Sequence, residues 1–153
     1  MTSEQRQQEL EELLSEITSD ETVRRMKEYT QHGRVSTFEH CENVARLSYA
    51  IDRRLSLNSD KRVLLTGAML HDFFLYDWHE GGRANRLHGF THADKALENA
   101  RQAFDIDEKT GQVIYSHMWP LNPGRIPASR EAWIVCIADK VVSLKETLFR
   151  RRG

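Results

Sequence analysis

The sequence predicts an all-α protein, a single-domain bundle of about six to seven helices. Apolar residues recur at spacings of three and four along nearly every segment, and no run combines strand alternation with flanking turns. Three prolines among 153 residues leave room for long helices. The length matches one ordinary domain, which buries roughly two thirds of the surface that its unfolded chain exposes.

Two helices are expected in the N-terminal segment, residues 3–30. The first should cover residues 3–17, with an apolar stripe of Leu10, Leu13, Leu14 and Ile17. Asp20 has a side chain that favours a helix cap, and it should open a short second helix that ends near Tyr29. We expect this segment to pack onto the rest of one domain that spans residues 1–153.

The third and fourth helices should bring the first histidines inward. Thr37 is expected to cap the third helix. Its inward face, with spacings of four, three and four, carries His40, Val44, Leu47 and Ile51. Ser59 or Asp60 should open the fourth helix, which ends at the adjacent pair His71 and Asp72.

A long loop, residues 73–90, should follow this pair. Loops of more than about 15 residues are uncommon in compact domains and are often functional. Thr91 is expected to cap a fifth helix, which carries His92 and ends near Phe104.

The C-terminal part should contain two more helices. One is expected over residues 107–117, followed by a proline-rich linker over residues 118–127. The last helix should span residues 128–151 and begins with the apolar run AWIVCIA, immediately before Asp139.

The charge balance and the cysteines disfavour several classes of protein. Lys and Arg total 22 against 23 Asp and Glu, so the net charge of -1 predicts neither a long nucleic acid nor an anionic membrane as partner. No stretch approaches the ~20 apolar residues of a membrane span and the N-terminus lacks the pattern of a signal peptide, so we expect a cytoplasmic protein. Cys41 and Cys136 lie far apart in apolar patterns, which favours buried, reduced cysteines over a disulfide.

Asp139 is the most informative single residue. A carboxylate flanked by apolar residues within a helix is costly to bury unless a cation or a strong donor compensates it. Lys140 projects about 100° away around the helix and is therefore a poor partner for that role. The alternatives are a metal ion and a salt bridge to an Arg on a neighbouring helix.

Other potential metal ligands lie on or near the predicted helices. A histidine on an apolar face, such as His40, is on its own more often a core residue than a ligand. The coincidence of several shifts the balance, because six such residues are distributed over five predicted helices: His40, His71, Asp72, His92, His117 and Asp139. A helical bundle can direct such residues into one internal pocket.

In their order along the chain, these residues resemble the HD-domain superfamily of metal-dependent phosphohydrolases. The resemblance is carried by a His on one helix, an adjacent His-Asp pair at the end of the next and Asp139 in the late sequence IADK, and it spans residues 32–146. His92 and His117 resemble the two additional histidines of members that bind two metal ions, such as hydrolases of dinucleoside polyphosphates or cyclic dinucleotides.

The resemblance implies an HD-like helical fold and a two-metal site. His40, His71, Asp72 and Asp139 would hold the first metal, and Asp72 would bridge to a second metal held by His92 and His117. Imidazole and carboxylate ligands without thiolate suit divalent transition metals, with Fe or Mn favoured, Co, Ni or Zn as alternatives and Mg less suited. Two such ions can trap a bridging hydroxide as the nucleophile, which gives Asp72 a catalytic role.

One departure from the family concerns the cation expected beside the phosphate. Many members follow the His-Asp pair with a small residue and a Lys or Arg, whereas FFLY follows it here, at residues 73–76. Lys140 is a candidate for the missing catalytic charge, and so are Arg83, Arg86 and Arg125 of the flanking loops. For each arginine the alternative is a solvated surface position.

Further polar residues near the loop are candidates for substrate contact. His88 competes with His92 as a ligand of the second metal and is otherwise expected to contact the substrate. His32 and His79 are candidates for the mouth of the pocket. Asp77 is expected to act either as a general acid for the leaving group or as a loop cap.

Aromatic residues lie next to the proposed ligands in the sequence. Tyr76, Trp78 and Trp119 are candidates for a platform that binds a base or sugar. The alternative is that they plug the core beside the site, where an aromatic wall also excludes water.

The sequence therefore predicts a metal-dependent phosphohydrolase that cleaves a phosphate ester or anhydride of a small molecule, with nucleotides as candidate substrates. The choice between phosphomonoester and phosphodiester stays open, as does the oligomeric state. The alternatives are a regulatory module that binds metal and nucleotide with little turnover, and a helical bundle with buried polar networks. The ligands do not identify the substrate, because a metal clamp recognises the phosphoryl group while the loops determine specificity.

Overall fold

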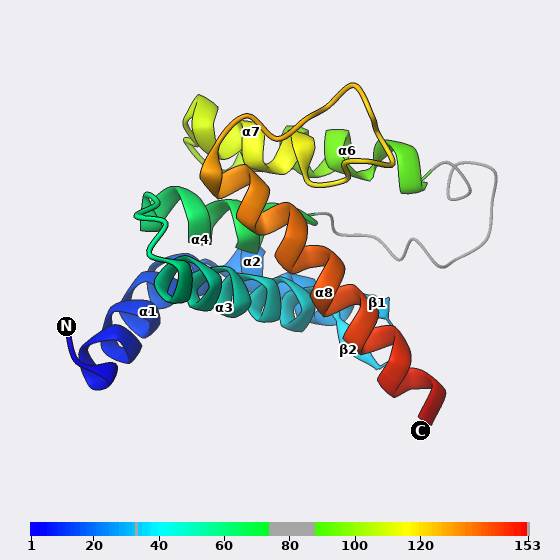
Figure 1. The fold of residues 1–153 in the computed structure, drawn as a ribbon. Coiled ribbons are helices and arrows are strands. Elements are labelled where there is room, and N and C mark those ends of the chain that lie inside the picture. The colour runs from blue at the N-terminus through cyan, green and yellow to red at the C-terminus, as the bar shows by residue number, and fades with distance from the viewer. Residues whose placement is uncertain (33, 74–87, 153) are drawn as a thin grey trace.

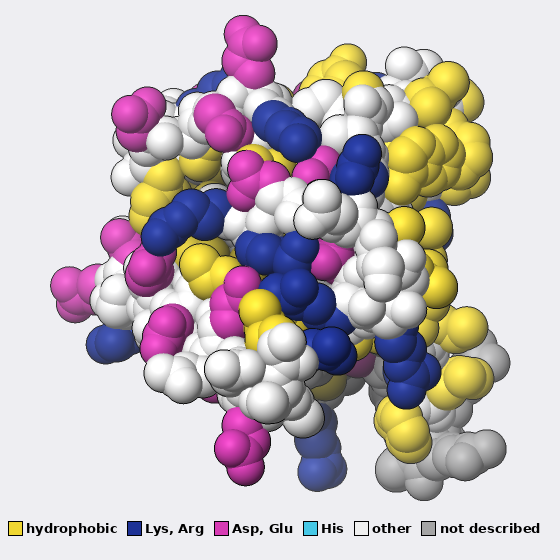
Figure 2. Space-filling model, turned by 60° about the vertical axis from the view of Figure 1, so that its left-hand side comes forward, with side chains coloured by type: hydrophobic (Ala, Val, Ile, Leu, Met, Phe, Trp, Pro, Cys, Tyr) yellow, Lys and Arg dark blue, Asp and Glu magenta, His cyan; other side chains and the backbone are white. Residues whose placement is uncertain are grey.

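The structure is a computed structural model that describes residues 1–32, 34–73 and 88–152 (Figure 1). Within these ranges it contains seven α-helices, a short 3₁₀ helix and a two-stranded sheet. The prediction of an all-α fold is confirmed. Figure 2 shows acidic and basic side chains interspersed over one face of the molecule, in line with the net charge of -1.

The N-terminal segment forms α1 (Ser3–Thr18), α2 (Glu21–Arg24) and the 3₁₀ helix η1 (Arg25–Glu28). Asp20 caps α2 as predicted, because its carboxylate accepts hydrogen bonds from two backbone N–H groups of the first turn. The second predicted helix is therefore divided into an α-helical turn and a 3₁₀ turn that ends at Glu28, with Tyr29 as its C-cap.

A small antiparallel hairpin, β1 (Thr30–His32) and β2 (Val35–Ser36), leads into the third helix. The expectation that no strand is present is wrong at this point. Strands of three and two residues are too short to show the alternation by which a strand is recognised in a sequence. The hairpin matters for the site, because β1 brings Gln31 to the core.

Two central helices follow, α3 (Thr37–Leu55) and α4 (Lys61–Leu70). The predicted cap of α3 is wrong by one position: the Ser36 hydroxyl accepts the N–H three residues later, and Thr37 is the first helical residue. Ser36 has the extended backbone that a cap requires. Asp60 caps α4 and settles the choice between the two predicted candidates.

The C-terminal helices are α6 (His88–Ala103), α7 (Glu108–Ser116) and α8 (Arg130–Arg152). The prediction that Thr91 caps α6 is wrong, because the helix begins three residues earlier and Thr91 lies in its first turn. The predicted loop thus loses its last three residues to α6, and residues 74–87 of it lie outside the described ranges.

The helices pack around one core. α3 lies against both α4 and α8, α4 lies against α7, and α6 lies on α7 (Figure 1). α1 packs on α4. Fully buried apolar side chains from these helices include Val44, Leu64, Leu65, Met69, Ile114 and Val135. The ends of α4 and α7 and the middle of α8 thereby meet near the first turns of α3.

Cys41 and Cys136 are both buried and free, so they form no disulfide. Among the described residues, no helix combines the length and the apolar character needed to cross a membrane.

Candidate metal centre

Six predicted ligands come from five helices. His40 lies in the first turn of α3, and His92 lies in the first half of α6. His71 and His117 are the C-caps of α4 and α7, with Asp72 directly after α4, and Asp139 lies in α8. All six side chains are buried, with residue exposures of at most 9%. The packing of the helices therefore brings the predicted ligands together inside the core.

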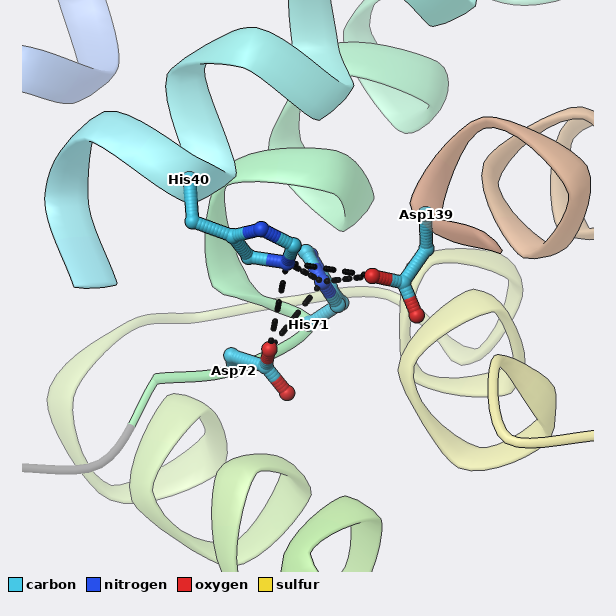
Figure 3. Close-up of side chains that lie close together, drawn as sticks. All are labelled: His40, His71, Asp72 and Asp139. Atoms are coloured by element: carbon cyan, nitrogen blue, oxygen red, sulfur yellow. Dashed lines mark hydrogen bonds and ion pairs between the residues drawn. The ribbon is translucent and has the colours of Figure 1, made fainter. Parts of the chain in front are cut away.

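The first group joins the α3, α4 and α8 ligands (Figure 3). The Oδ1 atom of Asp139 lies 3.0 Å from the Nε2 atom of His40 and 3.3 Å from the Nε2 atom of His71. The Oδ2 atom of Asp72 lies 3.3 Å from the His71 Nε2 atom and 3.5 Å from the His40 Nε2 atom. These four ligand atoms lie within 4.8 Å of one another, which is close enough for one metal ion.

The second group consists of Asp72, His92 and His117. The Nε2 atoms of His92 and His117 are 2.9 Å apart. The Oδ1 atom of Asp72 lies 3.3 Å from the first of these nitrogens and 3.4 Å from the second. One carboxylate thus presents Oδ2 to the first group and Oδ1 to the second.

Hydrogen bonds on the far side of the rings orient three of the histidines. The Nδ1–H groups of His71 and His117 donate to the carbonyl oxygens of Ala68 and Ile114, each at 2.6 Å. The Nδ1 atom of His40 lies 2.9 Å from a carboxylate oxygen of Glu146, which can only accept when it is ionised. In the neutral form of each ring, the Nε2 lone pair therefore faces the cluster.

The donor set fits a metal ion. Nε2 lone pairs and carboxylate oxygens converge in a buried space, and lone pairs that face one another repel unless a cation lies between them. Asp72 Oδ1 has no hydrogen-bond partner among the described residues although it is buried. Imidazole and carboxylate groups are ligands that divalent transition metals prefer.

The pKa shifts of these groups also indicate that the cluster is stable when it contains positive charge. Burial lowers the pKa of His40, but hydrogen bonds to Asp139 and Glu146 outweigh it and raise the pKa to about 10. Burial raises the pKa values of Asp72 and Asp139, but the neighbouring histidines hold both well below the usual range. In the absence of metal, protons on His40 and His71 supply positive charge that balances the carboxylates, so protons and metal compete for this site.

Two polar residues of the site were missed by the sequence analysis. Glu146 of α8 contacts His40, and the Nε2–H group of Gln31 donates to Asp72 Oδ2 at 2.8 Å. Glu146 follows Asp139 by seven residues and so lies on the same helix face, a spacing that the sequence shows. Gln31 had no such signal, because the strand that carries it was not predicted.

Lys140 and Arg125, which were predicted to supply positive charge to the site, bond to other groups of the protein. The Lys140 ammonium group bonds to the carbonyl oxygens of His117, at 3.2 Å, and Cys136 instead of pointing at the carboxylates. Arg125 pairs with Asp94 of α6 at 2.9 Å and lies over the ring of Tyr115.

Trp119 packs edge-on against Trp133 of α8, with ring centroids 5.1 Å apart. The side chains of His32 and His88 lie outside the described part of the structure. The same holds for the whole of Tyr76, Asp77, Trp78, His79, Arg83 and Arg86.

Comparison with known proteins gives one result. The family model described as HD domain matches residues 37–144, which include all six proposed ligands and more than two thirds of the chain. Searches of curated proteins and of solved structures found no match.

Proposed function

We propose, since this chain belongs to the HD-domain family, that it is a metal-dependent phosphohydrolase with a two-metal centre. Most members of the family are metal-dependent phosphohydrolases, and a buried cluster of His and Asp residues supports binding of divalent metal here. The observation that carries the two-metal proposal is the placement of Asp72, whose two carboxylate oxygens each face a separate group of ligands.

In this proposal the first metal is held by His40, His71, Asp72 and Asp139, and the second by Asp72, His92 and His117. When bound, such ions supply Lewis acidity towards a phosphoryl oxygen and lower the pKa of water. The residues of the chain hold the ligands in place and exclude bulk water from the cluster. The histidine-rich, thiolate-free donor set favours Fe or Mn, with Co, Ni and Zn as alternatives.

The substrate side of the proposal has support from the sequence alone. Asp77 is proposed as general acid, and the substrate contacts are proposed for His32, His79, His88, Trp119 and Arg125. Nucleotides are the first candidates, because the relatives that the two additional histidines resemble act on them. Lys140 is the cation nearest to Asp139 in the sequence, and it would have to leave its carbonyl partners to reach a phosphate.

Elemental analysis of the purified chain tests the metal centre. We expect one to two transition-metal ions per chain, and a folded protein that stays empty on titration with Mn²⁺, Fe²⁺ and Co²⁺ would contradict the proposal. Loss of metal from Asp72→Ala but not from Glu131→Gln would locate it at the cluster, since Glu131 is a buried carboxylate that bonds Asp60 and Lys109 at the other end of α8.

Phosphate release distinguishes an enzyme from a regulatory module. Nucleoside monophosphates, dinucleoside polyphosphates and cyclic dinucleotides are screened with the loaded protein, and Asp72→Ala is the control. Turnover by the parent that the variant lacks supports the enzyme. Tight binding of a nucleotide without turnover supports the regulatory alternative.

A further inference from the structure

We propose that Gln31 and Glu146 are positioning residues that hold Asp72 and His40 in the orientations that bind metal, an inference that rests on the proposed function. Both side chains are buried, at 6% and 9% exposure. Both contact a proposed ligand and neither is a member of a ligand group. Residues of this kind tune metal affinity although they do not touch the ion.

Glu146 acts on His40. Its Oε2 atom lies 2.9 Å from the Nδ1 atom, and a hydrogen bond there directs Nε2 at the cluster. The corresponding partners of His71 and His117 are neutral backbone carbonyls. Glu146 therefore adds a negative charge behind His40, which makes that ring a stronger donor to a cation.

Gln31 acts on Asp72. Its amide nitrogen donates to Oδ2, while the hydroxyl of Thr37 approaches its amide oxygen at 3.5 Å and favours this orientation of the amide. A carboxylate held at Oδ2 has a fixed plane, so Oδ1 stays directed at His92 and His117. Gln31 thus matters most for the second group.

The two residues lie on either side of the matched family region, residues 37–144. Gln31 is delivered by the β1–β2 hairpin and Glu146 by the C-terminal part of α8. The elements that flank the matched family region therefore supply additional contacts to the proposed ligands.

Cobalt titration tests the role of Glu146. Co²⁺ affinity is measured by visible absorbance, which reports on the ligands of the ion, in competition with a chelator. We expect Glu146→Leu to weaken binding by about 10- to 100-fold. Glu146→Gln should lose less, because its amide oxygen still accepts from Nδ1–H, and Glu131→Gln should match the parent.

Gln31→Met keeps the length of the side chain but cannot donate. We expect it to weaken the second equivalent of Co²⁺ by about tenfold and the first by less, with Gln31→Asn as the conservative variant if Gln31→Met does not fold by circular dichroism. Parent affinity in the folded Glu146 and Gln31 variants would overturn this inference alone. A parent that binds no Co²⁺ would instead overturn the proposed function.

The outer surface of α8 carries exposed apolar side chains. Six large apolar side chains on this helix are exposed, between 37% and 69%, and form what we call the α8 apolar face: Trp133, Ile137, Val141, Leu144, Leu148 and Phe149. The opposite side of the helix packs on the core through Ala138 and Val142. Figure 2 shows hydrophobic side chains gathered in a band along the right-hand edge of the molecule. A contiguous apolar face of this kind on a helix marks an interaction site.

The spacing and the charges of this face indicate what covers it. Ile137, Val141, Leu144 and Leu148 are spaced by four, three and four residues, the repeat of a coiled-coil seam. The exposed charges beside the seam are Lys140 and Lys145, whereas the acidic residues of α8 up to residue 149 are all buried. Two copies paired through this seam would place lysines near lysines, which disfavours a homodimer.

We infer that the α8 apolar face binds an amphipathic helix of another protein that carries acidic residues beside its apolar seam. The apolar side chains would supply the buried area, and Lys140 and Lys145 would select the charge of the partner. Asp139 and Glu146 lie on the opposite side of α8, so such a partner would cover the helix that supports the metal centre.

Two designed helical peptides with the same Leu and Ile seam, one flanked by Glu and one by Lys, serve as probes. At low salt we expect the Glu peptide to bind at least about tenfold more tightly, and Leu144→Glu to abolish this binding. Leu55→Glu, at an exposed apolar residue of α3, is the matched control and should bind as the parent does. Equal binding of both peptides, binding of neither, or a dimer by light scattering that Leu144→Glu dissociates would overturn the inference.

Discussion

Asp72 shows how one residue can organise a site at the scale of single atoms. Its backbone lies directly after α4, and its two oxygens face different ligand groups while Gln31 holds the oxygen on the first side. His71, its neighbour, is fixed by the carbonyl of Ala68 within the last turn of the same helix. A helix end thus fixes two adjacent ligands with few additional contacts.

Substitutions at single ligands should separate the two ions. We expect His92→Ala to lose the second ion and keep the first, because His92 belongs to the second ligand group, where its Nε2 atom contacts Asp72 and His117. Asp72→Asn should weaken both, since the carboxylate is shared. Elemental analysis after dialysis gives the stoichiometry. If His92→Ala retains both ions, the second metal is held without this residue.

The part of the candidate site that consists of metal-ligand residue types on predicted helices could be predicted from the sequence. All six proposed ligands were selected by residue type and position, and the structure brings them together. Gln31 could not be predicted, because a three-residue strand is too short to show a periodic pattern in the sequence. The surroundings of Lys140 and Arg125 depend on side-chain partners from distant segments, Asp94 among them, which spacing along the chain does not show.

At the scale of elements, α4 and α7 approach each other so closely that only a small residue fits at their contact. A Cβ atom added at Gly67 would lie 2.6 Å from Cγ1 and 2.9 Å from Cβ of Val113, a residue that is completely buried. These two helices end at His71 and His117, so their separation also sets the distance between ligand groups.

Gly67→Ala should therefore destabilise the protein although alanine is the better helix former. We expect a loss of about 1–3 kcal/mol in the free energy of unfolding from overpacking, against a gain of about 1 kcal/mol in helix propensity at most. Urea denaturation measures it. Gly124→Ala is the control, because an added Cβ there meets no atom within 4 Å, and similar values for both variants would contradict the packing argument.

The connection between α3 and α4 should contribute to the dependence of stability on pH. Asp52 of α3 is buried, its Oδ2 atom lies 2.7 Å from the ammonium group of Lys61, and its Oδ1 atom accepts the Ser59 N–H. Burial raises the pKa of Asp52, but Lys61 and Ser59 outweigh it, so the pKa lies below its usual value. The folded state then binds the proton less readily than the unfolded state.

The direction in which stability changes with pH follows from that difference in proton affinity. The stabilisation by Asp52 is complete above the unfolded pKa of about 3.9 and is lost as the pH falls through the lower folded value. Asp52→Asn should lower stability by about 1–3 kcal/mol at neutral pH and flatten the loss of stability in acid. Urea denaturation at several pH values checks this. A variant whose acid loss remains as steep as the parent's would assign that loss to other groups.

The elements themselves were predictable in proportion to their length. The long helices have enough turns for the apolar spacing to be read, and Asp20 and Asp60 were recognised as caps. The β1–β2 hairpin is too short for such a signal. The cap of α3 was misplaced because the adjacent Ser36 and Thr37 can both cap a helix, and the cap at Thr91 was misplaced because α6 already begins at His88. Local chemistry indicates that a helix begins, and tertiary packing selects the residue.

At the scale of the whole molecule, the ligand groups connect elements that are distant in the sequence. His40 and Asp139 are 99 residues apart and meet at 3.0 Å. In the absence of metal, several buried charges and polar groups are held in this space by contacts among themselves. Bound metal would therefore join α3, α4, α6, α7 and α8 at one point.

Metal should raise the stability of the whole fold, because an ion that binds only the folded state shifts the unfolding equilibrium. At a free concentration of about 100 times the dissociation constant the gain is about 2.7 kcal/mol, which for a chain of this size corresponds to roughly 5–11 °C in Tm. Calorimetry with added Mn²⁺ and after treatment with a chelator measures the difference. Asp139→Asn should show little of the increase, since it loses a ligand of the first group while its amide still fills the same space. If the parent and this variant gained equally, the stabilising ion would have to bind elsewhere.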